Sequence, residues 1–383
     1  MNEFRFDDIR PYRDSEVNDA VRLLLNDKTF RFLLEYLFPG QKPDEWIKKA
    51  ENINSVRGFQ EIIMYPFTKE LLQKSSSGIT FDGLEKLKKD KAYLYISNHR
   101  DIILDSAILN VLLYENNLDT CEIAIGNNLL LNEWITLFVK LNKNFIVRRD
   151  LSGRQLFEHS QTLSHYIRQQ ITQHDTSVWI AQREGRTKDG NDKTQQGVLK
   201  MLGISGENDF YQNYSSIRIA PMAISYEYDP CDILKAKQLY LKNKGFSIKR
   251  NKDDLRDILQ GLTGIKGRIH LSLGKIVDEK LKEIATIKNK NKQLFLLADL
   301  IDQRIHKNYK LWPTNYIAYD RIYTPKYSEE YTKEDCEMFD EHLRKQSEKF
   351  NTAKDEIYRL ILTCYAMPVL NKARLKDEEM LSL

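Results

Sequence analysis

A histidine followed by two carboxylates is the part of the sequence best suited to chemistry. His99 comes soon after a short apolar segment, residues 93–96, and Asp101 and Asp105 follow it. Histidine exchanges a proton near neutral pH, because its ordinary pKa is about 6.5, and a nearby carboxylate can fix which ring nitrogen carries that proton. Asp105 also precedes an apolar stretch typical of a helix, where an acidic residue can instead cap the helix start. These residues alone leave both roles open.

The composition indicates a folded globular protein. The chain has 383 residues, of which 41% are hydrophobic and 10% aromatic, enough for one large domain and an accessory one. No apolar run reaches the roughly 18 residues that span a bilayer, and the N-terminus lacks the basic and apolar regions of a secretion signal. We expect a cytoplasmic protein without an integral membrane anchor.

Charge and cysteine content argue against two kinds of site. The 59 basic and 55 acidic residues give a net charge of +4, too balanced for a molecule whose whole surface binds nucleic acid. The four cysteines are widely spaced, form no CxxC motif and share no metal-ligand spacing with the seven histidines. We therefore expect a reducing compartment, no structural zinc and no nucleic-acid partner.

The pattern along the chain predicts three regions. Residues 1–78 read as amphipathic helices and end in a serine-rich stretch, residues 75–78, that is typical of a linker. Residues 79–230 alternate β-rich and helical segments, which predicts an α/β fold with a mostly parallel central sheet flanked by helices. Residues 231–383 are helix-rich, with one further strand or two that complete or cover this core.

Polar side chains follow several of the expected strands. These strands cover residues 93–97, 122–125, 145–147, 178–181 and 217–225. His99 follows the first strand, Arg148 and Arg149 follow the third, and a glycine-containing turn, residues 183–190, follows the fourth. In an open α/β sheet, ligands bind beyond the carboxyl ends of the strands. A base and several fixed positive charges converging there would suit an acceptor that bears a phosphate and a hydroxyl group.

The order and spacing of four segments between residues 90 and 230 resemble the glycerolipid acyltransferase family, whose members acylate glycerol 3-phosphate or lysophosphatidic acid. Asn98-His99-Arg100 begins like the family's first block, a histidine and an aspartate separated by four residues. Here five residues separate His99 from Asp105. Asp101 is the other candidate for the orienting carboxylate, and we prefer Asp105 because it stands at the expected helix start, as in the family.

The other three segments match the remaining blocks of the family in order. Residues 145–149 resemble the second block, an apolar run that ends in a basic pair. Residues 184–187 resemble the third block, Glu-Gly-x-Arg, without the intervening residue, so that either Arg186 or Lys188 stands in the phosphate-contacting place. Residues 219–224 resemble the fourth block, an apolar run with a proline.

The resemblance implies direct acyl transfer from acyl-CoA or acyl-carrier protein to a hydroxyl of glycerol 3-phosphate or a lysophospholipid, in phospholipid biosynthesis. His99, oriented by Asp105, would be the general base, with no metal and no cofactor besides the thioester co-substrate. The implied substrate-binding residues are Arg148, Arg149, Glu184, Gly185, Arg186 and Lys188. An acylated product favours a protein that acts peripherally at the cytoplasmic membrane face.

Other conspicuous residues are assigned no chemistry. The aromatic run at residues 315–323 alternates like a strand and is expected in the core. Two basic segments, residues 235–252 and 280–292, are expected to be solvated faces, or to attract anionic lipid or acyl-carrier protein. The histidines expected only at the surface or in packing are His159, His165, His174, His270, His306 and His342.

Two other classes of function stay open from the sequence. A metal-dependent phosphoesterase would use His99, Asp101 and Asp105 as ligands and would lose its activity to a chelator. A non-catalytic lipid-binding protein with a decayed site would show no turnover and would keep binding lipid after His99→Ala.

Overall fold

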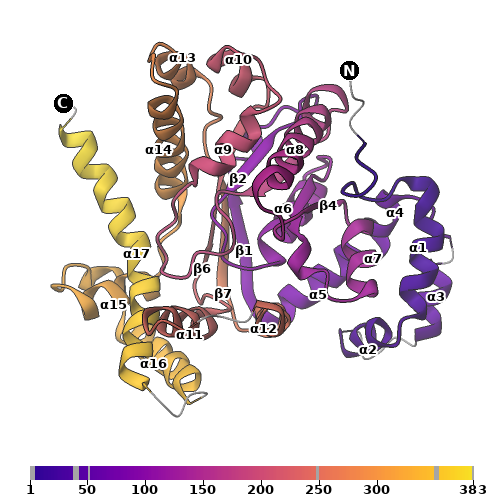
Figure 1. Cartoon of the computed structure of the whole chain (residues 1–383). Coiled ribbons are helices and arrows are strands. Elements are labelled where there is room, and N and C mark those ends of the chain that lie inside the picture. The colour runs from indigo at the N-terminus through magenta and orange to yellow at the C-terminus, as the bar shows by residue number, and fades with distance from the viewer. Residues whose placement is uncertain (1–4, 38–42, 51, 247–249, 349–352, 382–383) are drawn as a thin grey trace.

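The centre of the molecule is a seven-stranded sheet with the strand order β1-β7-β6-β2-β5-β3-β4 (Figure 1). The computed structural model describes residues 5–37, 43–50, 52–246, 250–348 and 353–381. Of the described strand pairs, β6 with β7 is antiparallel and the others are parallel. The strands are β1 (Ser76–Asp82), β2 (Leu94–Ser97), β3 (Glu122–Gly126), β4 (Asn144–Val147), β5 (Val178–Ala181), β6 (Ile219–Tyr226) and β7 (Gly267–Leu273). The predicted α/β fold with a mostly parallel sheet is confirmed.

Both faces of the sheet are covered, so its central strands are almost wholly apolar. Around β2, Tyr93 and Tyr95 belong to the apolar cluster on one face, and Leu94 and Ile96 to the cluster on the other. Alternate side chains of a strand point to opposite faces, and burial on both sides removes the need for polar residues between them. β2 can therefore hold the residues that follow it at a fixed place beyond the sheet edge.

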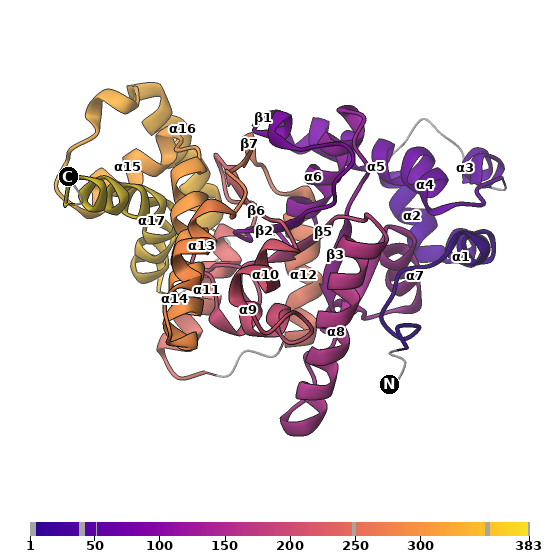
Figure 2. The same cartoon turned by 90° about the horizontal axis from the view of Figure 1, so that it is seen from above.

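The N-terminal helices share the apolar core of the first face with α6 and α7 (Figure 2). Phe30, Phe59 and Phe67 all pack against Phe138 of α7, with ring centroids 5.6–6.2 Å apart. The N-terminal helices are thus built into the fold and are not a separate appendage. The helices of this side are α1 (Asp14–Asn26), α2 (Lys28–Leu37), α3 (Pro43–Ala50), α4 (Val56–Phe59), η1 (Gln60–Met64, π-helical), α5 (Tyr65–Ser75), α6 (Leu104–Glu115) and α7 (Glu133–Leu141).

A second group of helices covers the opposite face (Figure 2). Tyr166 and Ile167 of α8, Leu199 of α9 and Leu297 of α14 are buried there against the sheet. The helices of this group are α8 (Gly153–Gln173), α9 (Gln196–Gly203), α10 (Phe210–Ser215), α13 (Glu279–Ala285) and α14 (Lys290–Asn308). Like β7, α13 and α14 come late in the chain, so the C-terminal region completes the central layers.

A third group of helices has its own apolar cluster around Phe339 at one side of the sheet (Figure 1). It consists of α11 (Asp232–Asn243), α15 (Pro313–Ile322), α16 (Lys333–Ser347) and α17 (Lys354–Leu381). We call these four helices the C-terminal helical unit. The remaining helix, α12 (Arg250–Thr263), lies against α5 and against the short helix η3 (Asn127–Leu129) that follows β3. None of the helices in the described part of the chain has both the length and the apolarity needed to cross a bilayer.

Two expectations about elements are wrong. Residues 315–322 lie in helix α15 and Tyr323 caps its end, so this run is not a strand. The buried residues Thr314, Ile317 and Ala318 are spaced three to four apart, and Pro313 starts the helix. The serine-rich stretch expected as a linker contributes to β1, which pairs in parallel with β7 at the sheet edge. The residues of β1 are mostly exposed, so the strand lacks the apolar alternation that reveals a half-buried strand.

Candidate functional site

The loop after β2 is tied to β6, and this places His99 at the carboxyl edge of the sheet. Asn98 exchanges two hydrogen bonds with Ile224 of β6: its Nδ2 donates to the carbonyl at 2.9 Å, and its Oδ1 accepts from the backbone N–H at 2.8 Å. The Asn98 side chain is fully buried. Because both of its polar ends are bonded, Asn98 holds the backbone before His99 in one position.

His99 and Asp105 form a hydrogen-bonded pair. Nδ1 of His99 lies 2.8 Å from Oδ2 of Asp105. The same oxygen accepts from the backbone N–H groups of Arg100 at 2.7 Å and Asp101 at 3.0 Å, and Oδ1 accepts from the Tyr226 hydroxyl at 2.8 Å. The Asp105 side chain is 0% exposed. A carboxylate that accepts from all these donors also accepts from His99, so the proton of the ring lies on Nδ1 and Nε2 keeps its lone pair.

Asp101 does not contact His99; its side chain caps the start of helix α6. Its Oδ1 accepts from the backbone N–H groups of Ile103 at 2.9 Å and Leu104 at 2.8 Å. Burial, together with the nearby Asp105, raises the pKa of the Asp101 carboxyl. Five residues separate His99 from Asp105, one more than in the family's first block, and the turn that Asp101 stabilises accommodates the extra residue. The two side chains therefore still come into contact.

His99 lines a hollow of about 640 Å³ that gathers most of the residues expected in the site. The His99 side chain is 12% exposed, and its ring makes an edge contact with Trp179 of β5, with centroids 5.5 Å apart. The predicted residues that line the hollow are His99, Arg149, Glu184, Gly185, Arg186 and Lys188. The base and the basic side chains therefore share one space.

Arg148 is placed differently from its neighbour Arg149. Its side chain is half exposed, its Nη2 donates to Asp150 at 3.2 Å, and its backbone N–H donates to Nε2 of His159 at 2.9 Å. Among the described residues, the lining of the hollow includes Arg149 without Arg148. Adjacent residues at a strand end point in different directions, so the structure does not bring this predicted pair to the site together.

The turn after β5 is joined directly to the loop between β2 and α6, residues 98–103, which we call the catalytic loop after the role that the sequence predicts for His99. The backbone N–H of Thr187 donates to the His99 carbonyl at 3.0 Å, and that of Glu184 donates to Oε1 of Gln195 at 2.9 Å. Gly185 has a φ of +69°, in the left-handed region that favours glycine. The turn therefore holds its polar residues at a set position beside His99.

Arg186 is the most deeply held basic residue of the turn. Its side chain is 8% exposed, and its Nη2 donates to a carboxylate oxygen of Asp257 on α12. Burial lowers the pKa of the guanidinium, but Cys231, Asp257 and Asp101 raise it by more, so Arg186 is positively charged. Lys188 also lines the hollow. Both candidates for the phosphate-contacting place are thus at the site.

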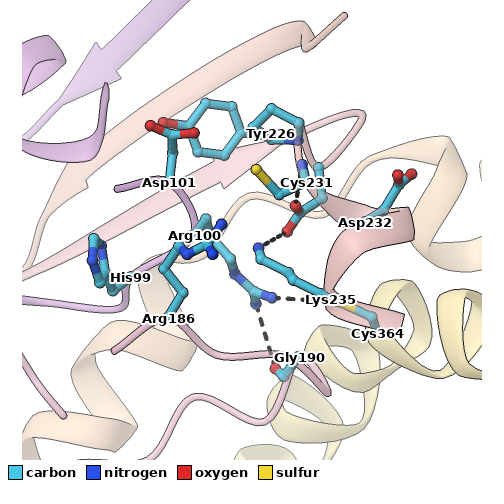
Figure 3. A network of polar contacts seen from close by, with 12 residues as sticks. His99, Arg100, Asp101, Arg186, Gly190, Tyr226, Cys231, Asp232, Lys235 and Cys364 are labelled. Atoms are coloured by element: carbon cyan, nitrogen blue, oxygen red, sulfur yellow. Dashed lines mark hydrogen bonds and ion pairs between the residues drawn. The ribbon is translucent and has the colours of Figure 1, made fainter. Parts of the chain in front are cut away.

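A second buried ion pair, between Arg100 and Asp192, joins the catalytic loop to the loop that follows β5. Arg100 also approaches Cys364 of the C-terminal helical unit (Figure 3). Nη2 of Arg100 donates to Asp192 at 2.6 Å and to the Gly190 carbonyl at 3.4 Å, and Nη1 lies 3.9 Å from Sγ of Cys364 on α17. Both charged side chains are almost fully buried. Burial lowers the pKa of Arg100, but Asp192 raises it to well above its ordinary value, so Arg100 is positively charged.

Several residues of the site had no signal in the sequence. Tyr226 and Asp257 lie more than 100 residues from His99, and Asp192 follows a loop rather than a strand. Only the fold brings them to the site. Arg183 also lines the hollow; it lies in the turn at residues 183–190, but no motif residue type marks it out within that turn. In the described residues, no group of three His, Cys, Asp or Glu side chains is arranged to hold a metal ion.

Comparison with known proteins agrees with the motifs. Residues 78–225 match the family model described as Acyltransferase. Among solved structures, the chain is similar to the 1-acyl-sn-glycerophosphate (LPA) acyltransferase PlsC from Thermotoga maritima, with 11% identity over 75% of this chain and 91% of that chain, and a TM-score of 0.39. No curated protein matches the chain. The match places an acyltransferase-like segment at residues 78–225, the part of the chain whose motifs resemble the glycerolipid acyltransferases.

Proposed function

We propose that the protein transfers a fatty acyl group from a thioester to a hydroxyl of a phosphate-bearing glycerol acceptor. The observation that carries this proposal is the His99–Asp105 pair, with its 2.8 Å contact, in a hollow that also contains Arg186 and Lys188. Hydrolysis of a thioester without a phosphate-bearing acceptor would need only His99 as the base. The basic side chains that line the hollow give an anionic acceptor a binding place beside His99.

The His99–Asp105 geometry supports a one-step transfer. Nε2 of His99 removes the proton from the acceptor hydroxyl as its oxygen attacks the thioester carbonyl. A carbon–oxygen bond forms, the carbon–sulfur bond breaks, and the thiolate leaves and takes the proton from the imidazolium. Asp105 stabilises the imidazolium while it exists. General-base catalysis of this kind contributes about 10²- to 10⁴-fold, and fixed positioning of the two substrates supplies more.

The charges around the hollow support an acceptor with a phosphate group. Five basic and three acidic side chains line it in the described residues. The basic ones are Arg149, Arg183, Arg186, Lys188 and Lys242, and the acidic ones are Glu184, Asp189 and Asp257. This excess of charge-assisted donors favours glycerol 3-phosphate or lysophosphatidic acid as the acceptor, with acyl-CoA or acyl-carrier protein as the donor.

We place the protein in the cytoplasm, in peripheral contact with the membrane. Phe246, at 63% exposed, lines the hollow together with Lys242 and the half-buried Leu239. Exposed apolar and basic side chains side by side favour contact with an anionic lipid surface. A lysophospholipid could then enter the hollow, or an acylated product leave it, without crossing water.

Thiol release from a long-chain acyl-CoA and from an acylated carrier protein, each with glycerol 3-phosphate or lysophosphatidic acid, tests the proposal. Glycerol is the matched acceptor without phosphate. We expect turnover that needs a phosphate-bearing acceptor, is poor with glycerol and survives a chelator. Loss of turnover on chelation would instead favour the metal-dependent phosphoesterase. Binding of lysophosphatidic acid with no turnover for any pair of substrates would favour a non-catalytic lipid-binding protein.

A further inference from the structure

The guanidinium of Arg186 uses one of its nitrogens to bind the protein and leaves another unbonded at the hollow. Nη2 donates to Asp257, while Nη1 is buried and has no hydrogen-bond partner among the described residues. The residue lines the hollow that also contains His99. A guanidinium carries five N–H donors, so one contact to Asp257 leaves donors for a ligand. A charged group with an unmet donor near a cavity is suited to an anionic oxygen.

Asp257 is itself fixed from two helices. The Asp257 residue lies on α12 and is 2% exposed, and the oxygen that accepts from Arg186 also accepts from Nε2 of Gln238 on α11, at 3.0 Å. Sγ of Cys231 lies 3.4 Å from the backbone carbonyl of Asp257. The Asp257 carboxylate is therefore held rigidly, whereas the Arg186 side chain that it contacts is long and flexible.

The next turn of α12 also packs on the catalytic loop. A Cβ atom placed on Gly261 would lie 2.1 Å from Oδ2 of Asp101, so only glycine allows this approach of the helix. α12 thus contacts the loop that carries His99 through Gly261 and the turn that carries Arg186 through Asp257. The helix sets these two segments relative to each other.

We propose that Asp257 is a positioning residue for the acceptor: it holds the Arg186 guanidinium in the wall of the hollow, so that the remaining donors meet an anionic oxygen of the acceptor. This inference rests on the proposed function. Without Asp257, Arg186 gains rotamer freedom that it must lose again when the acceptor binds. The cost then falls on acceptor binding and not on the chemical step or on the thioester.

Steady-state kinetics of Asp257→Ala and Asp257→Asn test the role. Asparagine keeps an oxygen that can accept from Arg186, and alanine does not. We expect Asp257→Ala to raise the KM for glycerol 3-phosphate or lysophosphatidic acid, whichever the wild type uses, about tenfold, with kcat and the thioester KM within about twofold. Asp257→Asn should recover most of this loss. A lower acceptor KM in either variant would mean that Asp257 competes with the acceptor for Arg186, and would overturn the proposal.

A double variant separates positioning from a general loss of structure. In an Arg186→Gln background, Asp257→Ala should cause no further rise in acceptor KM, because the group that it positions is gone. Additive losses would overturn the proposal. Asp320→Ala is the matched control: Asp320 is a buried carboxylate of α15 that accepts from the backbone of Tyr327 and does not line the hollow. It should lower the melting temperature without changing the acceptor KM.

Calorimetric titration of each variant with glycerol 3-phosphate gives a readout that does not need turnover. Weaker binding in Asp257→Ala and Arg186→Gln, with recovery in Asp257→Asn, supports the positioning role even if no acyl transfer is found. Acyl transfer by the wild type with an unchanged acceptor KM and unchanged binding in Asp257→Ala overturns this inference and leaves the proposed function intact. A wild type that neither binds nor acylates a phosphate-bearing acceptor overturns both.

Discussion

The two aspartates near His99 have different partners, and this separates their roles. Asp105 accepts from the imidazole, and Asp101 accepts from two backbone N–H groups at the start of α6. The sequence allowed either one to orient His99, since both follow it within six residues. The hydrogen bonds show that Asp105, and not Asp101, is the carboxylate in contact with His99.

Asp105→Asn should lower kcat at least about 100-fold, whereas Asp101→Asn should stay within about threefold of the wild type. Asparagine at position 105 can turn an N–H towards His99 and so stabilise the wrong tautomer, while asparagine at position 101 keeps the oxygen that accepts from the backbone. Thiol release at saturating substrates measures both. Equal losses in the two variants would contradict the assignment.

At the residue scale, the sequence indicated residues that the structure brings together around the hollow, but not the residues that hold them there. His99, Asp105, Arg186 and Lys188 were readable because each stands in a short motif after a strand. Tyr226 was not, because its only link to Asp105 is that β6 lies next to β2 in the sheet. Among the described residues, Arg148 is not part of the lining of the hollow, since a motif places a residue along the chain and does not give the direction of its side chain.

Helix α8 is joined to strand β3 by a buried acid. The Tyr166 hydroxyl donates to Oε2 of Glu122 at 2.7 Å, and the carboxyl is almost fully buried. Burial raises the pKa of Glu122 from 4.5 to about 7, against the opposing effects of Tyr166 and Lys143. In the folded state this carboxyl therefore keeps its proton to a higher pH than in the unfolded state.

The contribution of Glu122 to the free energy of unfolding should fall as the pH rises from about 4.5 to about 7, because the unfolded state binds fewer protons than the folded state in this range. Glu122→Gln does not titrate and keeps an oxygen that accepts from Tyr166. The variant should therefore gain stability relative to the wild type over this range. Urea unfolding at several pH values measures the difference, and a difference independent of pH would contradict the raised pKa.

At the element scale, buried strands were predictable and edge elements were not. The five strands expected between residues 93 and 225 are present, because burial on both faces makes each a continuous apolar run. β1 carries no such run, since one strand edge and most of its side chains are exposed. Residues 315–323 alternate in sequence but are helical, because Pro313 and the packing of Ile317 and Ala318 decide the local structure.

The C-terminal helical unit and the catalytic loop are linked through the interior of the molecule. Arg100 adjoins His99 and reaches Asp192 and the Cys364 thiol of α17 (Figure 3). Its guanidinium also lies over the ring of Tyr309, 5.5 Å from the centroid. Arg100 therefore connects the loop that carries His99 to α17 as well as to the loop after β5, although the unit contributes no residue to the His99–Asp105 pair.

Asp192→Ala should lower the free energy of unfolding by on the order of 3 kcal/mol, because it leaves the buried Arg100 charge without its carboxylate. Urea denaturation measures this loss. Arg321 and Asp340 form an ion pair within the C-terminal helical unit whose carboxylate is exposed, and Asp340→Ala, the comparison variant, should cost about 1 kcal/mol or less. Similar small losses in both variants would show that the Arg100–Asp192 pair does not brace the loop.

The central claim for the whole molecule is that His99 is the base of an acyl transfer. The most direct test is to compare acceptor-dependent thiol release by His99→Ala and by the wild type, after checking that the two proteins have the same melting temperature. We predict a loss of at least about 100-fold in kcat with the acceptor KM nearly unchanged. Turnover by His99→Ala at the wild-type rate would contradict the account.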